Sequence, residues 1–319
     1  MRILILGATG RHRSEAAIAR GAQSLGHEVR ILDTLRWRRL MGRWCDRFIR
    51  WQADRFSADL VLCTRHAINA GEAPLRAMLR GRRSVFWYFD APTPLPAPVI
   101  RLAHLTQQSF ATYGFQVEAL RAAGVADVKF LPQGFDPELD GPAETAPERY
   151  HCDLSFVGSG QYPRRYELLR SFAAVGAMQI RGPFWEQAPP DLPVAGGAVH
   201  GRGFAQVVRG AGLSLGVHAL DDQHQEHHGG TSNRLWKVLG ARGCLLGEYV
   251  DNIEDFARHG EHALWYRDPA QGAEIARMAL ADPAMRARIA AAGHAHALAH
   301  HTYAHRLALL LAGQGYISM

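Results

Sequence analysis

The chain of 319 residues is 47% hydrophobic and 21% charged, which is typical of a globular protein with room for two domains. No apolar run is long enough to span a membrane, and the N-terminus becomes polar too quickly for a signal peptide. The four cysteines have no paired spacing, which argues against a disulfide framework or a zinc knuckle. We therefore expect a cytoplasmic protein.

The net charge of +6 raises nucleic acid or an anionic membrane as partners. However, Lys129 and Lys237 are the only lysines among the 36 basic residues, and alanine is abundant. This bias indicates a GC-rich coding sequence rather than a polyanion site. It also makes Lys237 conspicuous, because this chain almost never uses lysine.

The first 145 residues alternate short apolar runs with helical patterns, which predicts βαβ units and a parallel sheet. Strands are expected at 2–7, 27–32, 59–63, 84–89, near 112 and at 128–132, with a helix over 14–25.

Residues 36–56 read as one basic, aromatic helix. Its apolar side chains recur at helical spacing on one face, with arginines around the rest: Trp37, Leu40, Met41, Trp44, Phe48 and Trp51. Such a helix suits a core-facing position with a solvated arginine face, and this is the plainer interpretation. Peripheral contact with an anionic membrane or stacking on nucleic-acid bases stays open as the alternative.

The strand pattern restarts after a polar linker at 137–148. Strands are expected at 153–158, 178–182, 198–203, 213–217, 244–248 and 263–267, with helices over 234–239 and 302–311. The predicted fold is therefore α/β, with two Rossmann-like, doubly wound parallel-sheet domains facing across a cleft. Ligands in such folds bind beyond the carboxyl ends of the strands, so the site is expected in that cleft.

The loop after the first strand carries Gly7 and Gly10, as in dinucleotide-binding folds. Arg13 occupies the third glycine position of that motif and would prevent the close packing of helix on strand. No Y-x-x-x-K pair occurs either. An NAD-dependent nucleotide-sugar epimerase or reductase is therefore an alternative rather than our main interpretation. His12, in the same loop, is an acceptor-side candidate.

Two strand-to-helix turns in the second half suit phosphate groups. Gly158, Ser159 and Gly160 precede a helix that carries Arg164 and Arg165, and Ser232 and Asn233 precede a helix that carries Arg234 and Lys237. Backbone N–H groups at a helix N-terminus attract anions, and the cations add to that field. Both turns are predicted to hold a diphosphate.

Catalytic and metal-binding candidates are sparser. Asp90 follows a predicted central strand and could act as a base on an acceptor hydroxyl, with His66 as a weaker candidate; a turn aspartate before prolines is the alternative for Asp90. The segment 218–233 is rich in histidine and acid, and more histidines lie at 294–305. Neither run has the spacing of a metal motif, so we expect no metal site.

The segment 231–269 resembles the C-terminal half of GT-B glycosyltransferases, most closely the CgeB-like group. The matching residues fall in three ordered blocks over some 75 residues: Ser232, Arg234, Trp236, Leu239 and Gly243, then His262, Trp265, Tyr266, Asp268 and Pro269, and finally His301, Thr302, Tyr303, His305 and Arg306. This resemblance implies an acceptor domain at 1–145, a donor domain at 146–300 and a C-terminal helix at 301–319 that packs back on the first domain.

The resemblance also assigns roles to residues. Donor binding would involve Gly158, Ser159, Arg164, Arg165, Gly201, Phe204, His228, Gly229, Ser232, Asn233, Arg234, Lys237 and Glu248. The acceptor side would include Gly7, Gly10, His12 and Asp136. Retaining GT-B enzymes carry two glutamates eight residues apart, but this chain has Gly229 and Lys237 at those positions, so retention or inversion stays open. Glu248 could supply the ribose contact instead.

We therefore interpret the chain as a glycosyltransferase that moves a sugar from a nucleoside-diphosphate-sugar donor without a cofactor or an essential metal. The acceptor is unidentified and could be a small molecule, a glycan, a lipid or a nucleic-acid base. A non-catalytic nucleotide-sugar-binding protein is an alternative, because both glutamates are absent.

Overall fold

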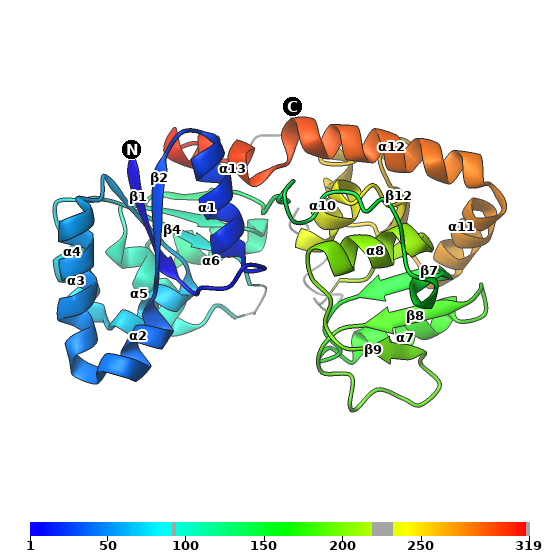
Figure 1. Cartoon of the computed structure of the whole chain (residues 1–319), viewed down its shortest axis with the longest axis horizontal. Coiled ribbons are helices and arrows are strands. Elements are labelled where there is room, and N and C mark those ends of the chain that lie inside the picture. The colour runs from blue at the N-terminus through cyan, green and yellow to red at the C-terminus, as the bar shows by residue number, and fades with distance from the viewer. Residues whose placement is uncertain (91–93, 219–231, 317–319) are drawn as a thin grey trace. The chain divides into compact units, whose positions relative to one another are not determined.

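The computed structural model describes residues 1–90, 94–218 and 232–316. The chain divides into two compact units: Met1–Gln133 together with the C-terminal segment from Tyr303, and Gly134–Thr302. Each unit is built around one six-stranded parallel sheet with helices packed on it (Figure 1). The predicted α/β fold class with two doubly wound sheets is confirmed. Residues 134–145 group with the second unit, whereas the sequence division assigned them to the first.

The first sheet has the strand order β2-β1-β3-β4-β5-β6. Its strands are β1 (Arg2–Gly7), β2 (Glu28–Asp33), β3 (Leu60–Cys63), β4 (Arg83–Tyr88), β5 (Gln108–Ala111) and β6 (Val128–Phe130). Short apolar runs form these strands because both faces of a parallel sheet are covered by helices and leave few positions for polar side chains.

Alternate residues of these strands enter two separate cores. Leu4 and Leu6 of β1 point into one core, and Ile3 and Ile5 point into the other. The first core is closed by α3 (Cys45–Phe56), α4 (Glu72–Leu79), α5 (Ala97–Leu105) and α6 (Gly114–Ala122). The second is closed by α1 (Ser14–Ser24) and the C-terminal helix α13 (Tyr303–Leu311).

The predicted single helix over 36–56 is wrong. The segment forms α2 (Thr34–Met41), a 3₁₀ turn η1 (Gly42–Trp44) and α3, with a break at Gly42. The backbone of Gly42 has φ +49°, which glycine adopts without the steric cost that a Cβ would add. Further 3₁₀ turns are η2 (Arg65–Ala70), η3 (Glu148–Tyr150) and η4 (Ile253–Asp255). No helix among the described residues is long and apolar enough to cross a membrane.

The C-terminal helix α13 is fixed to the first unit by a buried arginine and a close helix contact. The Nε of Arg306 donates to the carbonyl oxygens of Pro132 and Gln133, at 3.0 and 3.2 Å. Burial lowers the pKa of Arg306 to about 10. Gly21 of α1 lies directly against the backbone of Tyr303 at the start of α13.

The second sheet has the order β12-β11-β10-β7-β8-β9. Its strands are β7 (Cys152–Val157), β8 (Met178–Arg181), β9 (Val194–Gly196), β10 (Ala211–Gly216), β11 (Leu245–Glu248) and β12 (Leu264–Tyr266). The strand predicted at 198–203 is wrong, because β9 ends at Gly196. Gly201, with φ +51°, instead precedes helix α8 (Arg202–Gly210).

The helices of the second unit complete its core. Apolar residues of α7 (Arg164–Phe172), α11 (Pro269–Ala281) and α12 (Pro283–His300) join those of the strands in one buried cluster. Helices α8 and α10 (Asn233–Gly240) also pack against β10.

The contact between α1 and α13 gives a test of the packing in the first unit. A Cβ at position 21 would lie 2.9 Å from the backbone of Tyr303 and Ala304, so Gly21→Val should lower the free energy of unfolding by about 1–3 kcal/mol. The matched control is Gln23→Val, which places the same β-branched residue on an exposed position of the same helix. Urea denaturation measures both, and equal losses would contradict the assigned contact.

Candidate functional site

The connections of the second sheet define where a ligand is expected. The chain runs outward from β7 through β8 to β9 and then crosses back to β10, which pairs with the other edge of β7. At such a switch point, the loops that leave the two central strands diverge and open a crevice beyond their carboxyl ends. The residues there are those that follow β7 and β10, together with the start of α10.

Arg234 lies at this switch point. Its Nε donates to the carbonyl oxygen of Val157 at 2.8 Å, and its Nη1 donates to that of Val217 at 3.0 Å. The guanidinium also lies 4.4 Å from the centre of the Phe156 ring. A Cβ at Gly158 would clash with the guanidinium and with the Phe156 ring, so a side chain there would displace Arg234. Arg234 therefore joins the ends of β7 and β10 and brings its positive charge to the crevice.

The helix α10 begins beside this guanidinium. Ser232 is its N-cap, and the Ser232 hydroxyl accepts from the backbone N–H of Arg234 at 3.3 Å. Asn233 is the first helical residue. The early N–H groups of a helix lack partners within the helix, so this N-terminus carries partial positive charge. The sequence prediction of a helix here is confirmed.

Glu248, at the end of β11, is buried and holds two groups in place. Its carboxylate accepts from Arg164 Nη1 and Nη2 at 3.1 and 2.7 Å, and from the backbone N–H of His218 at 2.6 Å. These bonds link the start of α7 to the ends of β10 and β11. The ion pair is mostly shielded from water, since the Glu248 side chain is 7% exposed.

A pocket of about 630 Å³ opens next to this ion pair. It lies over the ends of β11 and β12 and is lined by residues that include Arg164, Glu248, Tyr249, Tyr266 and Asp268. The Tyr266 side chain is 2% exposed, and its hydroxyl has no hydrogen-bond partner among the described residues. Burial, with Glu248 nearby, raises the pKa of Tyr266. The pocket therefore offers a cation, a carboxylate and a phenol to a polar ligand.

Arg165 and Lys237, both expected at the diphosphate, make internal contacts. Arg165 is buried, and its Nη1 donates to the carbonyl oxygen of Ser159 at 2.6 Å, which braces the loop after β7. The Nζ of Lys237 pairs with Asp140 at 3.2 Å, and Asp140 is buried in the second unit. The Lys237 side chain therefore neutralises a carboxylate.

Other predicted residues lie outside the switch point. Phe204 is buried in α8, and Gly201 precedes that helix. Asp136, expected on the acceptor side, is buried in the second unit, where its carboxylate accepts from the N–H of Glu138 at 3.1 Å. His228 and Gly229 lie outside the residues that the structure describes.

The first unit has its own switch point between β1 and β3. The loop with Gly7 and Gly10 leaves β1 there. Sequence reasoning missed Glu15, which is buried at the start of α1 and accepts from Thr64 Oγ1 at 2.9 Å and from the N–H of Ala8 at 3.3 Å. An acidic residue in the first turn after a glycine loop is the signal that could have found it.

Asp90 and His66 both lie at this edge of the first sheet. The Asp90 carboxylate pairs with Arg65 Nη1 at 2.8 Å, and the Nε of Arg65 lies 3.5 Å from His66 Nε2. Burial raises the pKa of Asp90, and the neighbouring Arg65 opposes that shift. Burial lowers the pKa of His66. His12 is exposed in the loop after β1.

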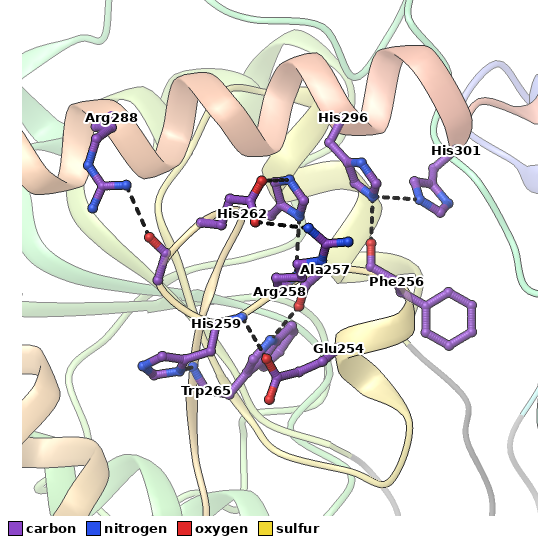
Figure 2. A network of polar contacts seen from close by, with 12 residues as sticks. Glu254, Phe256, Ala257, Arg258, His259, His262, Trp265, Arg288, His296 and His301 are labelled. Atoms are coloured by element: carbon purple, nitrogen blue, oxygen red, sulfur yellow. Dashed lines mark hydrogen bonds and ion pairs between the residues drawn. The ribbon is translucent and has the colours of Figure 1, made fainter. Parts of the chain in front are cut away.

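A histidine network contacts α10 through Trp236, and Figure 2 shows its His262, His296 and His301. The Nε2 of His296 lies 2.7 Å from the carbonyl oxygen of Phe256 and 3.0 Å from His301 Nε2. The ring of His262 stacks on His296 with centroids 4.1 Å apart, and His301 stacks on Trp236 of α10 at 4.0 Å. In the described part of the chain, no group of three or more histidine, cysteine and acidic residues is placed to hold a metal ion. These contacts join the C-terminal end of α12 to Phe256 and to α10.

Comparison with known proteins adds a family match and a shared fold. Residues 164–312 match a family model described as glycosyl transferase-like. The solved structure of Anabaena HepE in complex with UDP-glucose superposes with a TM-score of 0.69 at 14% identity, over 98% of this chain and 99% of that chain. Sucrose-phosphate synthase from Thermosynechococcus elongatus gives 0.67 at 11%, over 98% of both chains.

The lipopolysaccharide outer core galactosyltransferase WaaB, in its apo form, gives a TM-score of 0.56 at 12% identity, over 98% of this chain and 99% of that chain. No curated protein matches the sequence at a significant level. At these identities the structural matches establish the fold, which is GT-B.

The histidine network gives a pH test. Burial holds the pKa of His262 and His296 below the ordinary value of 6.5, so the unfolded chain binds more protons between the two values. The free energy of unfolding should therefore be highest above about pH 6.5. It should fall as the pH drops from that value through the lowered pKa values. Urea denaturation across this range measures the decline.

A variant isolates the network from the other histidines. His296→Gln keeps a donor for the Phe256 carbonyl but removes the titrating ring, so its stability should decline less with falling pH. His104→Gln, at an exposed position of α5, is the matched control. A decline of the same size in His296→Gln and in the unmodified chain would show that His296 does not contribute.

Proposed function

We propose that this chain, matched over 164–312 by the glycosyl transferase-like model, transfers a sugar from a nucleoside-diphosphate sugar to an acceptor hydroxyl. Its closing motifs favour the CgeB-like group within the GT-B fold. The observation that carries the proposal is the placement of Arg234 at the β7–β10 switch point, beside the N-terminus of α10. Both features provide positive charge where this fold leaves an open crevice.

The diphosphate would bind at this point. The carbonyl oxygens of Val157 and Val217 are neutral dipoles that orient the Arg234 guanidinium. The space beside the backbone of Gly158 is occupied by this guanidinium and by the Phe156 ring. When the bond between the sugar and the diphosphate breaks, negative charge grows on the leaving diphosphate. A fixed guanidinium and helix N-terminus would stabilise that charge most in the transition state.

The nucleoside would occupy the adjacent pocket. A volume of about 630 Å³ is within the range of small-molecule sites. The Glu248 carboxylate has about four lone-pair positions and receives three donors from Arg164 and His218, which leaves acceptor capacity for a ribose hydroxyl. The buried hydroxyl of Tyr266 would gain a partner in the same pocket. In this proposal, Glu248 makes the ribose contact that the absent family glutamate would make.

The acceptor would be activated by the first unit. Asp90 is the proposed base: it would take the proton from the acceptor hydroxyl as that oxygen bonds to the sugar and the nucleoside diphosphate departs. Burial raises the pKa of Asp90, and the ion pair with Arg65 opposes that rise. No metal or cofactor enters this scheme, since the cations that meet the leaving group belong to the protein.

A non-catalytic nucleotide-sugar-binding protein is the second candidate. The observation that favours it is the contact of Lys237 with Asp140, because Lys237 occupies one of the two glutamate positions and is turned to a structural role. Such a protein would bind nucleotide and would not hydrolyse or transfer the sugar. Turnover of donor separates the two candidates.

Nucleotide binding tests the donor site. Arg234→Ala should weaken binding of a nucleoside diphosphate by about tenfold or more, because hydrogen bonds to charged groups contribute about 1.5–3 kcal/mol. Calorimetric titration with UDP, GDP, ADP and dTDP, with and without EDTA, measures the affinity, and NAD tests the dehydrogenase alternative. Arg277→Ala, at an exposed position of α11, is the matched control.

Two further variants keep this test decisive. Arg234→Lys serves as the second variant if Arg234→Ala fails to fold, because it retains the charge and a donor. It should bind nucleotide more weakly than the unmodified chain. Lys237→Ala leaves the buried Asp140 unpaired, so it should lower stability more than nucleotide affinity. Unchanged affinity in the folded Arg234 variants would refute the donor site.

The pH dependence of turnover tests the base. Asp90→Asn should lower kcat on the order of 10²–10⁴-fold and leave nucleotide affinity intact. Arg65 lowers the pKa of Asp90, so Arg65→Gln should raise that pKa and move the acidic limb of the kcat/KM profile to higher pH. Hydrolysis of UDP-glucose, with water as acceptor, provides the readout. An Arg65→Gln enzyme that is slower but keeps the same acidic limb would remove Asp90 from this role.

A further inference from the structure

The segment α2–η1–α3 exposes an unusual set of side chains. Of the five large hydrophobic residues that are exposed among the described residues of the first unit, three lie here: Leu40, Trp44 and Trp51, with exposed fractions of 65%, 51% and 49%. Six exposed arginines accompany them: Arg36, Arg39, Arg43, Arg47, Arg50 and Arg55. We call these nine residues the basic–aromatic face.

The inner side of the same segment is already used for packing. Cys45, Ile49, Ala53 and Phe56 of α3 are buried in the core of the first unit. Trp37 is half-buried, and its ring lies 4.3 Å from that of Phe48. The core-facing interpretation of the sequence therefore accounts for these positions. It does not account for Leu40, Trp44 and Trp51, whose side chains are exposed to solvent.

The exposed indole rings make cation–π contacts with neighbouring arginines. Trp44 is the N-cap of α3 and has helical backbone angles, and Trp51 follows seven residues later, about two helical turns, so the two side chains project from about the same side. The guanidiniums of Arg43 and Arg47 lie 5.5 and 5.0 Å from the Trp44 ring, and that of Arg55 lies 5.3 Å from Trp51. Each exposed indole is therefore flanked by cations that can contact an anion while the ring enters an apolar layer.

The charge of this face has one sign. The only acidic residues of the segment are Asp46 and Asp54, and both have cationic partners: Asp46 pairs with Arg38 at 2.5 Å, and Asp54 pairs with Arg82 and Arg50. A groove of about 470 Å³ lies between α3 and α4; three arginines, Arg50, Arg76 and Arg80, line it together with one acid, Glu72, which pairs with Arg76. Helices α3 and α4 lie side by side in Figure 1.

We propose that the basic–aromatic face binds the surface of an anionic lipid bilayer. Leu40, Trp44 and Trp51 would enter the boundary between headgroups and acyl chains, and the arginines would contact lipid phosphates. Nucleic acid matches the arginines and the indoles but not Leu40, which has no flat ring for stacking on a base and is the most exposed of the large hydrophobics. A bilayer surface matches all three side-chain types.

This inference does not rest on the proposed function, because it concerns only the first unit and needs no nucleotide. Vesicle binding can succeed or fail whether or not the chain transfers a sugar. If both hold, the enzyme would work at a membrane surface, which favours an acceptor that resides there.

The test is flotation of the full chain with vesicles. The protein should bind vesicles of phosphatidylcholine mixed with phosphatidylglycerol, bind phosphatidylcholine alone far more weakly, and lose binding in high salt. Each arginine near an anionic surface contributes about fivefold, so Arg43→Ala with Arg47→Ala should reduce partitioning by about tenfold or more. Trp44→Ala with Trp51→Ala should reduce it as well, and neither pair touches the core.

A matched control separates this face from general stickiness. Arg277→Ala with Met278→Ala removes one exposed arginine and one exposed hydrophobic residue from α11 in the second unit, and should leave partitioning unchanged. No flotation of the unmodified chain, or an equal loss in this control, would overturn the proposal.

A labelled single-stranded oligonucleotide tests the competing partner by fluorescence anisotropy. Leu40→Asn should weaken vesicle binding. The membrane proposal would be overturned if the chain binds the oligonucleotide and does not bind vesicles. If oligonucleotide binding is also lost in the Trp44 and Trp51 variant but kept in Leu40→Asn, the face would be assigned to nucleic acid.

Discussion

The second unit depends on one guanidinium. At the ends of β7 and β10 the carbonyl oxygens of Val157 and Val217 point beyond the ladder, and buried carbonyls need donors. Arg234 supplies both from a single planar group, which a lysine ammonium would not match in geometry. A Cβ at Gly158 would displace the guanidinium from this position. The hydrogen bonds of Arg234 to Val157 and Val217 thus also place a positive charge at the carboxyl ends of β7 and β10.

The surrounding polar groups follow from the same constraint. A charge near a low-dielectric interior needs partners, so Arg164 and Glu248 pair, and the N–H of His218 takes part of the remaining carboxylate capacity. The ring of His301 stacks on Trp236 and so helps to hold α10 in place. Burial lowers the pKa of His296, because a charged ring there would have to be desolvated.

The first unit also has a switch point, but its strand order β2-β1-β3-β4-β5-β6 differs from that of the second sheet. Glu15 bonds to Thr64 there and Asp90 pairs with Arg65, whereas the second unit has Arg234 and the pair of Arg164 with Glu248. In our proposal, Asp90 accepts a proton and Arg234 meets the leaving diphosphate. The outer side of α2 and α3 is independent of both sites, because only its inner residues belong to the core.

The sequence by itself determined the α/β class and both parallel sheets, because short apolar runs spaced by helical patterns recur in each half, although it misplaced β9. It also determined the helix that Ser232 caps. It could not determine partners. Lys237 and Arg165 look like phosphate ligands in the sequence, yet Asp140 and the Ser159 carbonyl, which the fold brings to them, already engage them. Glu15 was missed for the same reason, since its contact with Thr64 spans 49 residues. Local patterns encode backbone conformation and burial, whereas the pairing of charges is decided by distances that only the tertiary structure fixes.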